Sequence, residues 1–167
     1  MSAKITSINY CPVKSVSFQS VKNCKIKKNI GIIGDRIFAF AKDLNTEQAK
    51  LFEKSPEERK GKWNKVLTLK NSPALNKYNF IFEDEKLTLT QKNKEILSID
   101  INQSSEREAL SNQISELESS LKQPITLMKN EDFPFFDTSI SKKVDFVNSV
   151  SLLNIQSIND FEKKVNK

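Results

Sequence analysis

The chain has 167 residues, which is enough for one domain with a hydrophobic core and barely enough for two. It contains no histidine, so Ser-His-Asp triads, Cys-His pairs and His-containing metal sites cannot be built from this chain alone. The net charge of +6 favours an anionic ligand or partner. We interpret the charge as dispersed, because the basic runs are too short for a nucleic-acid-binding arm.

Cys11 and Cys24 are the only cysteines, and no signal peptide precedes them. We therefore expect two reduced thiols in a cytoplasmic protein. No apolar run approaches the roughly 20 residues that span a bilayer, so we expect no membrane partner. The chain has only three glycines, which means that Asn, Asp, Ser and Lys must occupy many of its turns.

The first third of the chain reads as a series of strands. Residues 5–10 alternate as a strand, and Pro12 marks its edge or end. Residues 17–26 predict a second strand with an irregularity, and residues 29–34 are turn-like. The apolar run that follows, residues 36–41, predicts a buried strand.

These strands carry a candidate phosphate-binding group. Lys14 and Ser15 follow the first strand, and Arg36 opens the buried one. Adjacent strand ends would place all three side chains on one rim, where an ammonium, a hydroxyl and a planar guanidinium suit the oxygens of a phosphate. The alternative stays open, because Gly34-Asp35 is an ordinary turn dipeptide and surface lysines and arginines are usually only solvated.

The two segments together resemble a known family. Pro-Val-Lys-Ser at residues 12–15, followed by Gly-x-x-Gly-Asp-Arg at residues 31–36, resembles the N-terminal β-barrel domain that precedes MOSC (molybdenum cofactor sulfurase C-terminal) domains. Relatives of this kind include the amidoxime-reducing components, which carry a molybdenum cofactor. At the level of the family, the resemblance implies a molybdenum-dependent oxidoreductase or a sulfurase-related protein, with pyridoxal phosphate binding also known.

The resemblance further implies specific contacts. Lys14, Ser15 and Arg36 match positions that contact the phosphate end of the pterin cofactor, molybdopterin. A further polar contact comes from the polar stretch after residue 55 in such relatives, and Lys62 and Lys65 are its candidates here.

The next segment mixes a short helix with a polar loop. Residues 46–54 have helical composition, with Asn45 or Thr46 as the cap. Residues 55–62 are almost wholly polar and should form an exposed loop. Trp63, the single tryptophan, is expected to pack rather than to bind.

Short strands with polar turns then dominate. Residues 65–69 predict a strand, and residues 74–78 a single helical turn. Residues 78–82 and 87–90 alternate around a polar turn and predict a hairpin, and residues 95–101 add another strand. Such a run of short strands is typical of a barrel or a sandwich.

One longer helix interrupts the strands. Ser105 and Glu108 form a capping-box pattern at its start, and Pro124 ends it. An apolar stripe at helical spacing should pack on the core, and it consists of Leu110, Ile114, Leu117 and Leu121. A strand should return at residues 125–128. We therefore predict a mainly β (α+β) fold over residues 1–145, a small antiparallel β-barrel with one long amphipathic helix.

The tail reads as the remnant of another domain. Three phenylalanines surround Pro134 and should pack on the domain surface. A strand or turn at residues 149–154, followed by a helix capped by Ser157, resembles the entry into the MOSC core. Residues 146–167 are therefore expected to be a partial strand-helix remnant, the start of an incomplete MOSC domain.

The resemblance also limits what the chain can do by itself. In the family, the cysteine thought to ligate molybdenum lies in the MOSC core, and neither Cys11 nor Cys24 occupies a matching place. A pterin phosphate pocket cannot replace that soft thiolate. We therefore expect this chain to lack the molybdenum ligand, to be inactive alone and to hold no cofactor by itself.

The leading interpretation is a barrel that contributes phosphate-binding residues to a cofactor pocket. Its expected partners are the missing MOSC core, on the same polypeptide or on a second chain, and a redox partner. A non-catalytic or partner-dependent interaction module keeps the same fold and remains an alternative. A small basic β-barrel that binds nucleic acid is disfavoured, because the aromatic residues fall at inward-facing positions without an interleaved basic cluster.

Overall fold

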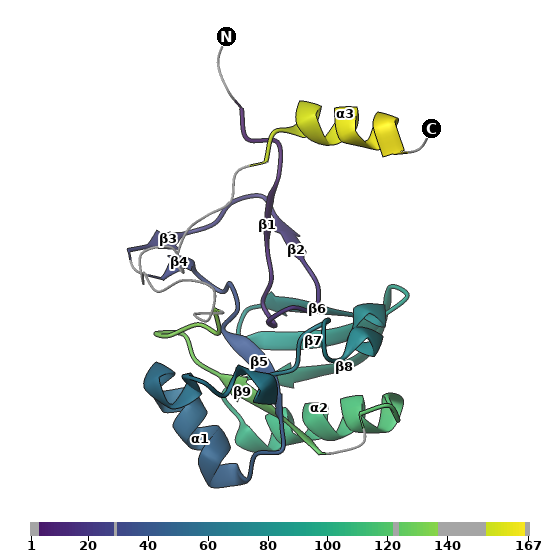
Figure 1. Cartoon of the computed structure of the whole chain (residues 1–167). Coiled ribbons are helices and arrows are strands. Elements are labelled where there is room, and N and C mark those ends of the chain that lie inside the picture. Colours follow the sequence, from purple (N-terminus) through teal and green to yellow (C-terminus); the bar gives the residue numbers. More distant parts are fainter. Residues whose placement is uncertain (1–3, 29, 122–123, 137–152, 166–167) are drawn as a thin grey trace.

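The computed structural model describes residues 4–28, 30–121, 124–136 and 153–165 (Figure 1). Within these residues the strands are β1 (Ile8–Tyr10), β2 (Gln19–Val21), β3 (Ile26–Lys27), β4 (Gly31–Ile32), β5 (Phe38–Lys42), β6 (Tyr78–Glu83), β7 (Lys86–Gln91), β8 (Lys94–Asp100) and β9 (Ile125–Lys129). The α-helices are α1 (Thr46–Lys54), α2 (Ser104–Leu117) and α3 (Ile155–Val165). Three 3-10 helices span Pro56–Arg59, Trp63–Lys65 and Pro73–Lys77.

Strand β5 lies at the centre and separates two hydrophobic clusters. It pairs antiparallel with β9. Both strands were predicted, β5 from its apolar run and β9 as the strand that returns after the long helix. Side chains alternate across a strand, so Phe38 and Phe40 enter the main core with β6–β8 and α2. Ala39 and Ala41 point to the other side, where they pack with α1 and Phe135. The predicted buried strand is therefore buried on both faces.

A three-stranded meander, β6-β7-β8, forms one wall of the main core. Two-residue turns connect its strands, with φ of 48° and 61° at Asp84 and Glu85, and of 50° and 63° at Lys92 and Asn93. These positive values are the ones that tight hairpin turns require. The predicted hairpin is confirmed, as is the expectation that residues other than glycine form many turns.

The first four strands form two small ribbons, β1-β2 and β3-β4. Side chains rather than a backbone ladder connect β2 to the meander. Ser17 Oγ accepts the Phe80 N–H at 2.9 Å, and Gln19 Oε1 accepts the Phe82 N–H at 2.8 Å. The described strands thus pair as four small antiparallel sheets, and the predicted mainly β (α+β) class is confirmed.

The helices begin and end differently from the sequence pattern. Asn45 caps α1 in a reciprocal capping box with Gln48, which decides between the two caps that the sequence left open. The predicted capping box at Ser105 is wrong, because α2 begins at Ser104 without a side-chain cap. The carboxylate of Glu106 instead accepts the N–H of Asp100 at 2.6 Å.

Helix α2 also ends earlier than Pro124, at Leu117. Leu110 and Ile114 are fully buried, as predicted for the stripe, but Leu117 is exposed. Glu118 follows the helix, and its carboxylate binds the Ser120 hydroxyl at 2.6 Å and the Lys77 ammonium at 2.5 Å. These contacts accompany the turn that ends the helix, before Leu121 packs against the core.

Two predictions between α1 and β6 are wrong. Residues 65–69 do not form a strand, since only Val66 makes a bridge, to Ala41. Residues 55–62 are not simply an exposed loop, because Arg59 is 2% exposed. Its guanidinium donates to the carbonyls of Phe52 and Phe133, each at 2.7 Å, and lies 4.0 Å from the Phe135 ring centroid. The helical turn predicted at residues 74–78 is present as a 3-10 helix.

The described part of the tail follows the predictions in part. Phe135 is fully buried and Phe136 half-buried, whereas Phe133 is exposed. Helix α3 is present but begins at Ile155, and Asn154 rather than Ser157 accepts the first N–H groups, at 2.9 Å from Gln156. The predicted segment at residues 149–154 lies mostly outside the described residues.

Both cysteines are free, as expected. Cys11 is buried, and its thiol donates to the Val13 carbonyl at 2.8 Å. Burial raises the pKa of this thiol above its usual value. Cys24 is half-buried.

Replacement of Arg59 with alanine should destabilise the fold by about 3 kcal/mol, because several buried carbonyls lose a charged donor. Burial lowers the pKa of Arg59 to about 10, so the guanidinium stays charged at neutral pH. Urea unfolding followed by circular dichroism measures the effect, with the exposed neighbour Lys60→Ala as control. Equal midpoints for the two variants would contradict the structural role of Arg59.

Cys11 should react with iodoacetamide much more slowly than Cys24 in the folded protein. The thiolate is the nucleophile, and a raised pKa leaves less of it at neutral pH. Labelling of Cys11 should accelerate as pH rises towards the raised pKa, and it should reach the rate of a free thiol in urea. Peptide mass spectrometry over a time course measures both sites. Faster labelling of Cys11 than of Cys24 at neutral pH would refute the prediction.

Candidate phosphate-binding site

The backbone brings the two motif segments side by side. Val13 forms a parallel bridge with Phe38. The Phe38 N–H donates to the Pro12 carbonyl at 3.1 Å, and the Lys14 N–H donates to the Phe38 carbonyl at 2.8 Å. One step earlier, the Arg36 N–H donates to the Cys11 carbonyl at 2.6 Å. The predicted adjacency of the two strand ends is therefore present in the backbone.

Asp35 fastens the loop before Arg36. One carboxylate oxygen accepts the Cys11 N–H at 2.9 Å, and the other accepts the Arg36 guanidinium at 2.6 Å. Gly34 precedes it with φ of +94°, and a Cβ at this position would lie 3.2 Å from the Tyr10 ring. Both facts favour glycine. Gly34 and Asp35 thus form a turn, as the composition indicates. The Asp35 carboxylate also connects this turn to Cys11, the residue that follows β1.

Lys14 is largely enclosed. Its side chain is 6% exposed, and its ammonium lies 5.2 Å from the centroid of the Trp63 ring. A cation at this distance from an indole face is attracted by the ring's quadrupole. Trp63 itself packs against the cluster of α1 and Phe135. The tryptophan therefore packs, as predicted, and also contacts a candidate site residue.

Arg36 is more accessible. Its side chain is 35% exposed, and besides Asp35 it contacts Phe136, whose ring centroid lies 5.3 Å from the guanidinium carbon. The Phe135 N–H donates to the Arg36 carbonyl at 2.8 Å, which fixes the segment that carries this ring. The Arg36 guanidinium thus contacts Asp35 and Phe136, and part of the side chain remains exposed to solvent.

Ser15 and Arg36 share an unusual backbone conformation. Their φ angles are 59° and 52°, in the left-handed region that residues other than glycine rarely adopt. Such conformations cost about 1–3 kcal/mol and cluster at ligand sites, where neighbouring structure maintains them. Here the bonds of Arg36 to Cys11 and to Asp35 help to maintain one of them.

The register separates the two cations along the strand ends. Arg36 lies opposite Cys11, and Lys14 lies three residues farther along the chain, in the turn that follows the Val13 bridge. The contacts described above direct Lys14 towards Trp63 and Arg36 towards Asp35 and Phe136. The structure therefore brings the backbones of the predicted site together, with its cationic groups at separate positions on the rim.

The sequence did not identify every residue in this region. Trp63 contacts Lys14, and Phe136 contacts Arg36, in each case from a distant part of the chain. No local sequence pattern predicts such contacts. The weaker candidates have other partners: Lys62 pairs with Glu58 at 3.5 Å, and Lys65 with Asp43 at 3.4 Å. Among the described residues, no group of three or more Cys, Asp or Glu side chains is placed to hold a metal ion.

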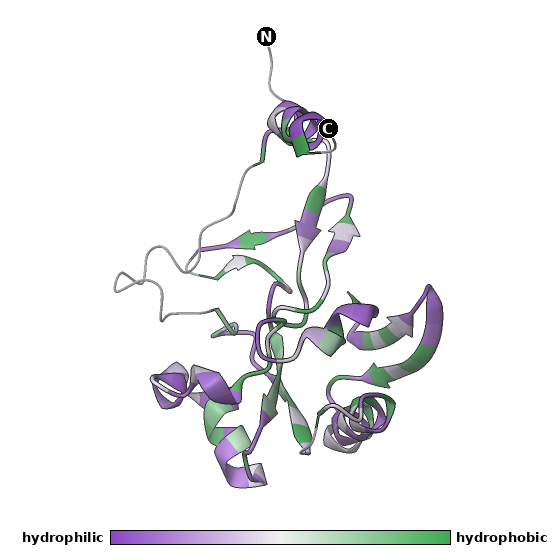
Figure 2. Ribbon diagram, turned by 45° about the vertical axis from the view of Figure 1, so that its right-hand side comes forward, coloured by the Kyte–Doolittle hydropathy of each residue, from purple (hydrophilic) through white to green (hydrophobic). Residues whose placement is uncertain are grey.

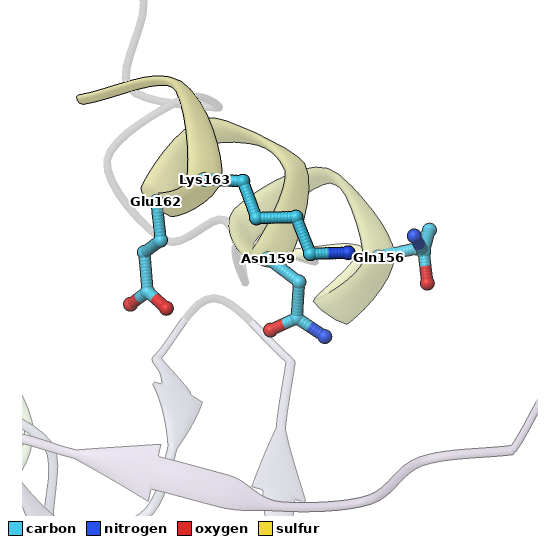
Figure 3. Close-up of a pocket in the computed structure, with 4 residues that line it drawn as sticks. All are labelled: Gln156, Asn159, Glu162 and Lys163. Atoms are coloured by element: carbon cyan, nitrogen blue, oxygen red, sulfur yellow. The ribbon is translucent and has the colours of Figure 1, made fainter. Parts of the chain in front are cut away.

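Two surface hollows lie elsewhere. One, over α3, is lined by Gln156, Asn159, Glu162 and Lys163, and Figure 3 shows Asn159 and Glu162 extending from the same side of the helix. The other is lined by residues that include Lys42, Asn71, Ser72 and Ile125. Neither involves Lys14, Ser15 or Arg36. Within the described residues, no helix is long and apolar enough to cross a membrane.

Comparison with known proteins identifies the family. The model of the MOSC N-terminal beta barrel domain matches residues 2–125, a range that runs from before β1 to the first residue of β9. Searches of curated proteins and of solved structures gave no match. The matched range contains both motif segments and most of the core described above. The chain therefore belongs to the MOSC N-terminal β-barrel domain family.

Proposed function

We propose that this chain forms the phosphate-holding wall of a molybdenum-cofactor pocket, with Lys14, Ser15 and Arg36 contacting the phosphate of molybdopterin. The observation that carries the proposal is the backbone pairing of the two motif segments, from Arg36–Cys11 to Lys14–Phe38. Membership of the MOSC N-terminal family supports it, since that family is associated with the cofactor.

The donor chemistry fits a phosphate monoester. Arg36 supplies a partly open fork, Lys14 a compact cation and Ser15 a hydroxyl, and such charge-assisted bonds are among the strongest in proteins. Asp35 neutralises part of the charge on Arg36 and orients its guanidinium. The rings of Trp63 and Phe136 contact the two cationic groups. When bound, the cofactor supplies redox chemistry at its molybdenum, and the residues named here bind and orient only its phosphate end.

A second element completes the pocket in this proposal. It is a MOSC core, on the same polypeptide or on another chain, and it supplies the thiolate ligand and the access for a redox partner. The apolar side of α3 supports such a partner, because Ile155, Phe161 and Val165 are all exposed. An apolar helix face of this kind is usually covered. We place the boundary between the two domains near residue 145, and the protein in the cytoplasm.

The same α3 face also favours the second candidate, a partner-dependent interaction module without chemistry of its own. Both candidates retain the fold and the exposed helix. Phosphate binding at the motif distinguishes them, because only the first needs it.

The double variant Lys14→Met, Arg36→Gln should bind molybdopterin at least about 100-fold more weakly than the unchanged chain. Each lost charged hydrogen bond costs about 1.5–3 kcal/mol, and the substitutions largely keep the size of both side chains. Titration followed by cofactor fluorescence measures the affinity, for the chain alone and for the chain joined to its MOSC core. Lys92→Met, Lys94→Gln, in a distant hairpin, is the matched control. Unchanged affinity in the double variant would remove the assignment.

The purified chain alone should not reduce N-hydroxylated substrates, because the proposal assigns the molybdenum ligand to the missing core. An assay of substrate reduction with an artificial electron donor and added cofactor tests this. Turnover by this chain without any other protein would show that it needs no second element.

A further inference from the structure

The net charge is concentrated in one part of the chain. Residues 1–34 contain six lysines and no acidic residue, while the remaining residues contain 21 basic and 21 acidic side chains. The whole net charge of +6 therefore lies in the first 34 residues. The interpretation of a dispersed charge, which rested on the short basic runs, is therefore wrong, because residues 1–34 contain no acidic residue.

The fold gathers this charge on the two ribbons. Figures 1 and 2 show β1-β2 and β3-β4 standing out from the other strands. Five of the six lysines are exposed in these strands or in the segments next to them, namely Lys4, Lys22, Lys25, Lys27 and Lys28. Lys27 has an acidic neighbour in another segment, Asp132, at 3.9 Å. Lys14 is the sixth and is buried, so this surface does not use the candidate phosphate site.

Large apolar side chains are exposed beside these lysines. Ile5, Phe18, Ile26 and Ile33 are between 51% and 74% exposed. Phe18 and Lys22 flank β2, and side-chain alternation places them on the face opposite to Gln19, which points to the meander. On the other ribbon, Ile26 and the pair of Ile33 with Lys25 project from opposite faces. Both ribbons thus combine exposed cations with exposed apolar groups.

We propose that the two ribbons bind peripherally to the surface of anionic lipid bilayers. In this arrangement the exposed lysines contact acidic headgroups. Phe18 on one ribbon and Ile33, which shares a face with Lys25, on the other enter the interfacial layer. Basic residues near a membrane surface and apolar groups inserted into it contribute together to peripheral binding. The expectation of no membrane partner rested on the lack of a spanning segment, which peripheral binding does not need.

The composition of the ribbons favours lipid over other anionic partners. Residues 1–34 contain no arginine, the residue that grips nucleic-acid phosphates with a fork and stacks on bases. Three of the four exposed apolar side chains are isoleucines, which cannot stack on a base. A second copy of the chain is disfavoured as the partner, since two surfaces of lysines repel each other.

Sedimentation of the full chain with vesicles tests the proposal. We expect binding to vesicles of phosphatidylcholine mixed with phosphatidylserine, little binding to phosphatidylcholine alone, and weaker binding as salt increases. The triple variant Lys25→Gln, Lys27→Gln, Lys28→Gln should bind roughly 100-fold more weakly, at about fivefold per lysine. Ile33→Ser should weaken binding and leave its salt dependence unchanged, because Ile33 shares a face with Lys25.

A control with the same charge change lies on the meander. Lys86→Gln, Lys92→Gln, Lys94→Gln removes three exposed lysines from β7, β8 and the turn between them, and it should bind like the unchanged chain. Circular dichroism checks that each variant is folded. No binding to acidic vesicles at low salt, or an equal loss in both triple variants, would overturn the proposal. Tighter binding to polyuridylic acid than to the vesicles would replace it with a nucleic-acid surface.

Discussion

The two-sided burial of β5 is the constraint on which the rest of the structure depends. Phe38 and Phe40 fill the main core, and Ala39 and Ala41 leave room for α1 on the other face. Close packing does not tolerate an exchange of these two faces, because large side chains would meet the helix and small ones would leave cavities opposite β6–β8. A shift of one residue would exchange them, so the register with β9 is strongly specified.

The candidate site is an extension of this strand. The first residue of β5, Phe38, accepts and donates the hydrogen bonds that align residues 12–14, and Arg36 lies just before it. Packing of β5 therefore positions the rim, and Asp35 adds the local bonds that shape its turn. The enclosed Lys14 follows from the same arrangement, because Trp63 packs on the alanine side of the strand.

Local patterns predicted the local parts of this fold. The sequence predicted β6 and β7 from their alternation, β5 from its apolar run, and the pairing of the two motif segments. Each of these signals depends on residues that are neighbours in the sequence. The sequence did not predict the burial of Arg59, because its guanidinium binds the carbonyls of residues 52 and 133, and the second of these is distant in the sequence. In the candidate site, the motif predicted the adjoining backbones but not the ring contacts of Lys14 and Arg36. The concentration of lysines in the first 34 residues is visible in the sequence. Only the structure shows that these residues form ribbons that protrude from the other strands.

Ser17 and Gln19 have a consequence for how this protein behaves in a crowded solution. An edge strand with unpaired N–H and C=O groups is a template on which another chain can add a strand. On β6 the Phe80 N–H is already bonded to the Ser17 hydroxyl, and the N–H and carbonyl of Phe82 are bonded to the Gln19 amide. Two polar side chains thus take the place of a neighbouring strand. They let the ribbons diverge from the meander and still protect its edge from aggregation.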